Sequence, residues 1–207
     1  MTDIENLAAS GCRYLQQDNE NSAWNCFMQM YYKIVENPFD LNHVTDFKSV
    51  GIALNTLMLF GTIKDVDIQQ RIYSIAYLCI SKAIQQCPDV NAYSTRVMIL
   101  HYGMDSFMFT VDEVLHILSQ PTWMTESLLK KELCKMLLAD FYNSPRLETF
   151  DTMFSQIKTQ LENSAKMGLL GNMDLKEIFK IGNENHQNVF NYLENKILVH
   201  GDVDFAG

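Results

Sequence analysis

The residues best placed for metal chemistry are Asp112, Glu113 and His116, which lie close together in the sequence. A helix would bring Asp112 and His116, four positions apart, to one face. A zinc site needs more ligands than this, and each of the other histidines stands alone in its segment. Acidic residues are also typical of the first turn of a helix, where the helix dipole favours negative charge. We therefore expect no metal site and no cofactor.

A possible nucleophile is Ser155, which forms a Ser-x-x-Lys pattern with Lys158. That pairing supports acyl transfer only with companion motifs, which this chain lacks, and it lies within an amphipathic helical stretch. The sequence also contains no G-x-G-x-x-G fingerprint, no phosphate-binding P-loop, no H-E-x-x-H and no G-x-S-x-G. We therefore predict that the protein is not an enzyme and that it has no catalytic residues.

The charge balance argues against nucleic acid as a partner. The chain has 16 basic and 25 acidic residues and a net charge of −9. Its densest basic cluster is Lys130, Lys131 and Lys135, and Glu126 and Glu132 flank it. Nucleic acids and anionic membranes both require an excess of basic charge at the binding surface. We expect the chain to bind neither.

The sequence predicts a cytoplasmic location. The N-terminus lacks the basic and apolar regions of a signal peptide, and no apolar stretch approaches the roughly 18 residues of a membrane span. The five cysteines are odd in number and widely spaced, without a C-x-x-C motif. They are expected to be free thiols in a reducing compartment.

Apolar residues recur at intervals of three and four, and only 9 Gly and 4 Pro interrupt the 207 residues. This pattern predicts an all-α fold, with one domain over residues 1–200 and a frayed tail over 201–207. Thr2 and Glu5 form a predicted capping box, and Asp46 or Thr45 is the predicted cap of a later helix. The predicted helices lie near 3–17, 20–36, 45–60, 66–86, 90–102, 111–119, 123–142, 145–166, 174–181 and 185–198.

The segment from Ala83 to Arg96 resembles the junction between two tetratricopeptide repeats. Pro88 follows Ala83 at the end of one helix, and an Ala-Tyr pair at 92–93 opens the next helix. Ala76 precedes Ala83 by seven residues, which is the spacing of the family pattern. The resemblance implies antiparallel helix hairpins that stack as an α-α superhelix. An irregular superhelix and a compact helical bundle are the alternatives.

The N-terminal stretch is similar to the same family. Gly11, Tyr14, Ala23 and Phe27 fall at its small, aromatic, small and aromatic positions. In such a repeat the small residues let two helices approach closely, and the aromatic residues fill the space between hairpins. The resemblance extends over residues 4–121. It departs from the pattern over 39–65, where the unit is too long, and it ends after 121.

The family binds a peptide or protein partner in a concave groove, so the resemblance implies the same role here. In its register the groove-facing residues of this chain, together with one candidate anchor, are Ala8, Cys12, Leu15, Thr95, Ile99, Tyr102 and Trp123. Such a mostly apolar surface needs a cover. The cover is either an amphipathic partner segment or the chain's own C-terminal helix, whose apolar stripe comprises Val189, Phe190, Leu193 and Ile197.

These observations predict a non-catalytic, protein- or peptide-binding module. The alternatives are a structural or homo-oligomeric helical component and a chaperone or immunity-type protein that sequesters a partner. An enzyme on an unrecognised helical fold ranks below them, because the sequence offers no convergent set of acids, bases or ligands.

Overall fold

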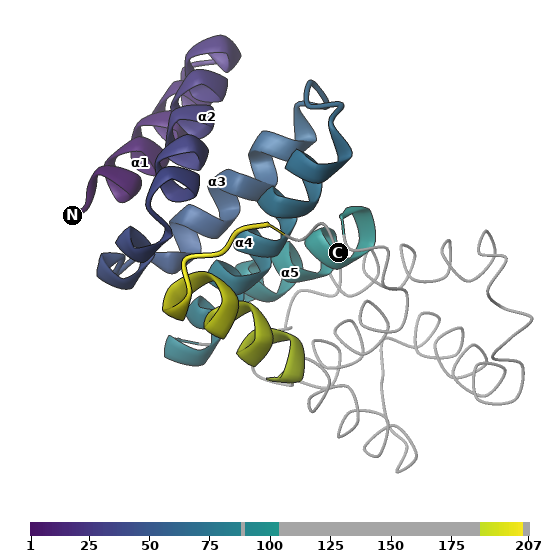
Figure 1. The fold of residues 1–207 in the computed structure, drawn as a ribbon. Helices are drawn as coiled ribbons and strands as arrows, with labels where there is room; N and C mark the ends of the chain where they lie inside the picture. Colours follow the sequence, from purple (N-terminus) through teal and green to yellow (C-terminus); the bar gives the residue numbers. More distant parts are fainter. Residues whose placement is uncertain (88–89, 104–186, 205–207) are drawn as a thin grey trace, which may run out of the picture. The chain divides into compact units, whose positions relative to one another are not determined.

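The computed structural model describes residues 1–87, 90–103 and 187–204 (Figure 1). The chain divides into two compact units, Met1–Asp105 with Gln187–Gly207, and Ser106–His186. All the described residues belong to the first unit. The helices predicted between 111 and 181, and the residues Asp112, His116 and Trp123, lie outside them. The single domain expected over 1–200 stays a prediction.

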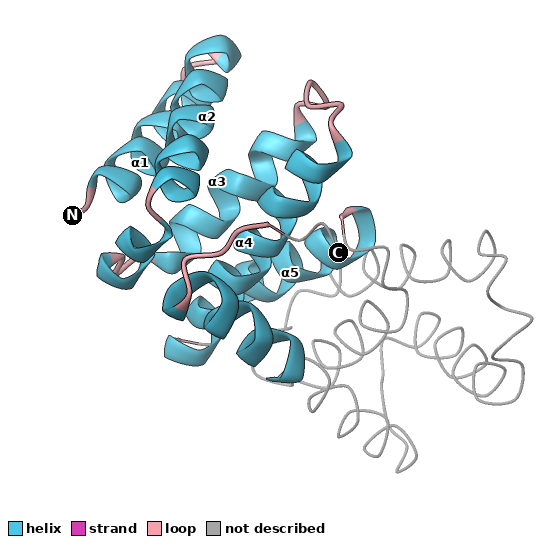
Figure 2. Cartoon of the chain, in the orientation of Figure 1, coloured by secondary structure: helices cyan, strands magenta, loops and turns pink. Residues whose placement is uncertain are grey.

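The described regular elements are all helices, which confirms the all-α prediction for this part of the chain (Figure 2). Three predicted ranges, 20–36, 66–86 and 90–102, coincide with observed helices. No helix in these segments is long and apolar enough to span a membrane. In chain order the elements are α1 (Asp3–Gln16), α2 (Glu20–Glu36), the 3-10 helix η1 (Pro38–His43), α3 (Phe47–Leu59), α4 (Val66–Gln86), α5 (Val90–Tyr102), a helix over 187–194, and its π-helical continuation η3 (Asn195–Val199).

Side-chain caps fix where the first helices begin. The Thr2 hydroxyl accepts from the Glu5 N–H at 3.2 Å, while the Glu5 carboxylate accepts from the Thr2 N–H at 2.6 Å. The predicted capping box is thus confirmed. Asp46 caps α3 by accepting from the Ser49 N–H at 3.0 Å. The helix therefore begins at Phe47, two residues later than the predicted start at 45.

The sequence reading missed the short helix η1. Pro38, which follows the predicted helix over 20–36, occupies the first turn of η1. Proline suits that position because its missing N–H would have no partner there and its fixed φ is already helical. Leu41 of η1 is fully buried. The segment between α2 and α3 therefore contributes Pro38 and Leu41 to the core.

Two helix hairpins form the frame of this unit. α1 packs on α2, and α3 packs on α4, with α5 packing on α4 in turn. A Cβ on Gly11 would overlap the ring of Phe27, so the glycine sets how closely α1 approaches α2. A Cβ on Gly51 would lie 2.6 Å from Cγ1 of Ile80, so α3 and α4 approach each other closely in the same way. In each hairpin, a glycine on the first helix faces a large side chain on the second helix, which allows the two helices to pack closely.

The positions predicted by the family pattern differ in burial. Ala23 and Phe27 are fully buried in the first hairpin, and Ala76 is fully buried in the second. Tyr14, expected to fill the space between hairpins, remains 37% exposed. The small positions therefore serve close helix packing, whereas the first aromatic position reaches the surface.

Candidate partner-binding surface

The residues predicted to face a groove range from buried to exposed. In the structure Ala8, Thr95 and Ile99 are buried, Cys12 and Leu15 are half-buried, and Tyr102 is exposed. They lie on α1 and α5, and each of these helices contacts α3. The buried residues are covered by the chain itself. The role of the set in binding stays a prediction, and Trp123 lies outside the described residues.

The last described segment, residues 187–204, packs against the N-terminal hairpins, and we call it the C-terminal strap (Figure 1). It consists of the helix over 187–194, the π-helical turn η3 and an extended end. Three residues of its apolar stripe are buried, with Phe190 at 5%, Leu193 at 3% and Ile197 at 0% exposure, and Val189 is half-buried. The chain's own frame therefore covers this stripe, and the prediction that the C-terminal helix covers the groove residues stays a prediction.

Lys82 of α4 holds the helical part of the strap. Its Nζ lies 2.5 Å from Oε1 of Glu194. The same ammonium lies 5.5 Å from the ring centroid of Phe47 and 5.8 Å from that of Phe190. A cation between two aromatic rings and a carboxylate is attracted by all three. One lysine thus joins α3, α4 and the strap.

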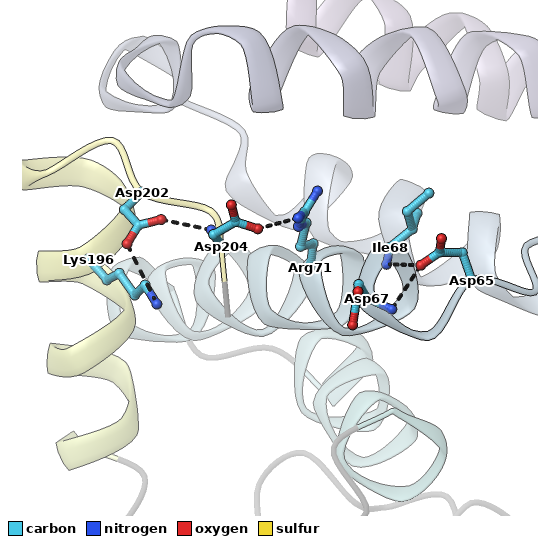
Figure 3. A network of polar contacts seen from close by, with 7 residues as sticks. All are labelled: Asp65, Asp67, Ile68, Arg71, Lys196, Asp202 and Asp204. Carbon is cyan, nitrogen blue, oxygen red and sulfur yellow. Dashed lines mark hydrogen bonds and ion pairs between the residues drawn. The ribbon is translucent and has the colours of Figure 1, made fainter. Parts of the chain in front are cut away.

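Arg71, nearer the start of α4, holds the extended end of the strap. Its guanidinium donates to Asp204 (Figure 3). Burial alone would lower the pKa of Arg71, but the charges of Asp204 and Tyr31 and the hydrogen bonds to both together outweigh burial and raise it above its ordinary value. Arg71 also forms a hydrogen bond with the hydroxyl of Tyr31 from α2.

Contacts within the strap shape its extended end. Lys196 lies 3.7 Å from the Asp202 carboxylate, and that carboxylate accepts from the Asp204 N–H at 2.8 Å (Figure 3). Val203 is buried. The sequence predicted that the chain would fray from residue 201, but residues 201–204 are held by these contacts and by Arg71.

The strap also contacts η1. The Asn42 side-chain amide donates to the carbonyl of Leu198 at 3.3 Å. Gly201 has a φ of +66° and lies under the ring of Phe39, where a Cβ would come within 2.9 Å of Cζ. A glycine is needed here both for the left-handed backbone and for the close approach. We call the surface beneath the strap the strap face, formed by Phe39, Asn42, Phe47, Arg71 and Lys82.

A small pocket lies where the start of α3 meets the end of α4. Its volume is about 230 Å³, below the roughly 300–1,000 Å³ of small-molecule sites. It is lined by Thr45, Asp46, Phe47, Lys48, Ala83, Gln86 and Cys87. Within residues 1–87, 90–103 and 187–204, no three His, Cys, Asp or Glu side chains gather as a metal site would require.

The sequence reading found the strap's apolar stripe but missed its charged anchors. Arg71 and Lys82 lie on one side of a single helix, a pattern that periodicity reveals. Their partners Asp204 and Glu194 are more than a hundred residues away, and no local signal pairs them. No family model, curated protein or solved structure matches the chain.

Proposed function

We propose that the chain is a non-catalytic module that binds a protein or peptide segment on stacked helix hairpins of the tetratricopeptide type. The hairpin order supports this proposal, because α1 contacts α3 and α3 contacts α5, as first helices do in a continuing stack. Gly11 and Phe27, which occupy a small and an aromatic position of the family pattern, pack directly together.

The main support for the proposal is that the strap packs on the surface of the helix hairpins. The hairpin frame holds an amphipathic segment that is distant in sequence, because the hydrogen-bonded Asn42 and Leu198 are 156 positions apart. The contacts combine a buried apolar stripe with ion pairs at Lys82 and Arg71. This combination is the helix-on-surface mode by which many binding modules recognise a partner.

The test is capture of a partner by the folded chain. Full-length protein is immobilised and exposed to an extract of its native organism, and bound proteins are identified by mass spectrometry. The control bait carries Leu54→Asp, which places a charge in the core and unfolds the frame, because Leu54 is fully buried.

A supporting result is a protein retained by the wild type and not by the control. The purified partner must then bind the purified chain in calorimetry with a defined stoichiometry. If both baits retain the same proteins, or if no retained protein binds when purified, the proposal fails. A stable homo-oligomer in light scattering, with no partner, would favour the structural alternative.

A further inference from the structure

We propose that the strap face binds an amphipathic partner helix that carries two acidic anchors, and that the C-terminal strap occupies this face as a displaceable ligand from the same chain. This inference rests on the proposed function. It names the surface and the class of partner.

The strap face presents two basic anchors on one stripe of α4. Arg71 and Lys82 are eleven positions apart. Such a spacing corresponds to about 16 Å along a helix and to about 20° around it. The strap face also carries the ring of Phe39, against Gly201, and the ring of Phe47, near Lys82. It therefore combines apolar rings with two positive charges, in a chain whose net charge is −9.

The strap matches this arrangement. Glu194 meets Lys82 near the end of α4, and Asp204 meets Arg71 near its start. The strap from residue 194 to residue 204 therefore extends from the end of α4 towards its start. Between these acids the strap buries Ile197, Leu198 and Val203. A partner that replaces it needs the same features, namely two acidic residues about ten positions apart with apolar residues between them.

The ion pairs between the strap and α4 are partly exposed to water, which favours dissociation of the strap. The side chains of Glu194 and Asp204 are 37% and 66% exposed, and those of their partners Lys82 and Arg71 are 21% and 27% exposed. Ion pairs open to water are weak and are screened by salt, so they orient the strap without locking it. The strap helix ends in a π-helical turn, a rare geometry that is frequent at functional sites.

The experiment measures binding of a fluorescent peptide with the sequence of residues 187–204 to three full-length proteins. These are the wild type, the variant Glu194→Gln/Asp204→Asn, and the control Glu20→Gln/Glu36→Gln. The control removes the same charge from exposed positions on α2. In the wild type the tethered strap competes at a high effective concentration. We expect the strap variant to bind the peptide about tenfold more tightly than the wild type or the control does.

Equal binding by all three proteins, or no binding by the folded strap variant, would overturn the inference. So would a peptide that carries both substitutions and binds as tightly as the native peptide, because the acidic anchors would then have no role. A dimer of the wild type in which straps are exchanged would replace the partner helix with a second copy and would also overturn it.

A second measurement covers the case in which the strap variant does not fold. Hydrogen exchange of the wild type is followed by mass spectrometry at low and at high salt. We expect residues 195–204 to exchange several-fold faster at high salt, while α2 is unchanged, because salt screens the exposed ion pairs. Strap protection that does not respond to salt would contradict a displaceable strap.

The two proposals can fail separately. If a captured partner binds the wild type and the strap variant equally well, it uses another surface, and only the strap-face inference fails. If the peptide binds the strap variant as expected while no partner is captured, the strap face stands and the proposed cellular function fails.

Discussion

The carboxylate of Glu5 accepts hydrogen bonds from both the backbone N–H and the hydroxyl of Thr45, each at 2.7 Å. It also accepts from the N–H groups of Asp46 at 2.9 Å and Thr2 at 2.6 Å. Glu5 is only 4% exposed. One acid therefore completes the cap of α1 and ties that helix to the start of α3.

This geometry predicts a pH-dependent contribution to stability. Burial raises the pKa of Glu5, but the hydrogen bonds from Thr45, Asp46 and Thr2 outweigh burial and lower it from 4.5 to about 2. Since the folded pKa lies below the unfolded one, the contribution is complete above pH 4.5 and is lost as the pH falls towards 2. We expect Glu5→Gln to lower the free energy of unfolding at pH 7 by about 1–3 kcal/mol, solvent screening included.

Urea titrations of both proteins between pH 2 and pH 7 measure this effect. The difference between wild type and Glu5→Gln should shrink below pH 4.5 and nearly vanish at pH 2. A control, Asp18→Asn, removes an exposed acid from the loop after α1. A Glu5→Gln deficit that stayed constant over the whole range would show that the carboxylate charge is not the cause.

Sequence reading succeeded where the determinants are local. The capping box of Thr2 and Glu5 spans four residues, and the bounds of α2 and α4 follow from apolar periodicity and caps. The second role of Glu5 depends on Thr45, forty residues away. Such a pairing is set by how the helices pack, which the pattern of a single segment does not encode.

The first hairpin makes a prediction about Gly11. Alanine is the better helix former by about 1 kcal/mol, yet a Cβ here would overlap the ring of the fully buried Phe27. We expect Gly11→Ala to destabilise the protein by about 1–3 kcal/mol, because the core must shift to accept the methyl group. Thermal and urea unfolding measure the change.

A double-mutant cycle identifies the contact. In a Phe27→Leu background, which leaves room beside residue 11, Gly11→Ala should be nearly neutral or stabilising. If the alanine costs the same in both backgrounds, the ring of Phe27 does not limit the approach of α1 to α2.

The second hairpin separates two alanines that the family pattern treats alike. Ala76 is fully buried, whereas Ala83 lines the pocket at the end of α4. Ala76→Phe should overpack the core and cost about 1–3 kcal/mol, while Ala83→Phe should cost less because its ring can enter the pocket. Melting temperatures of the two variants decide this. An equal or larger loss from Ala83→Phe would show that the pocket does not accept a side chain.

Some of the residues predicted to face the groove are buried in the structure. Two small positions of the register, Ala23 and Ala76, are fully buried. The register also assigned Ala8 and Ile99 to an open surface, and both are fully buried. Whether an apolar position of a helix faces a neighbour or a groove depends on the crossing of helices, which repeat spacing alone does not determine.

The described cysteines predict an order of chemical reactivity. Burial raises the pKa of Cys79 to about 12, and the nearby charge of Lys82 offsets this only in part. Burial also raises the pKa values of Cys12, with a contribution from the charge of Asp46, and of Cys26, and both thiols are half-buried. Cys87 is exposed.

Because the thiolate is the reactive form, iodoacetamide at pH 8 should modify Cys87 first and leave Cys79 intact until the protein unfolds. Peptide mapping by mass spectrometry over time measures each site. In a Cys87→Ser control, early labelling of the described cysteines should fall sharply, with Cys79 still protected. Modification of Cys79 at the rate of Cys87 in native protein would mean that Cys79 is open to solvent, which contradicts its burial in the second hairpin.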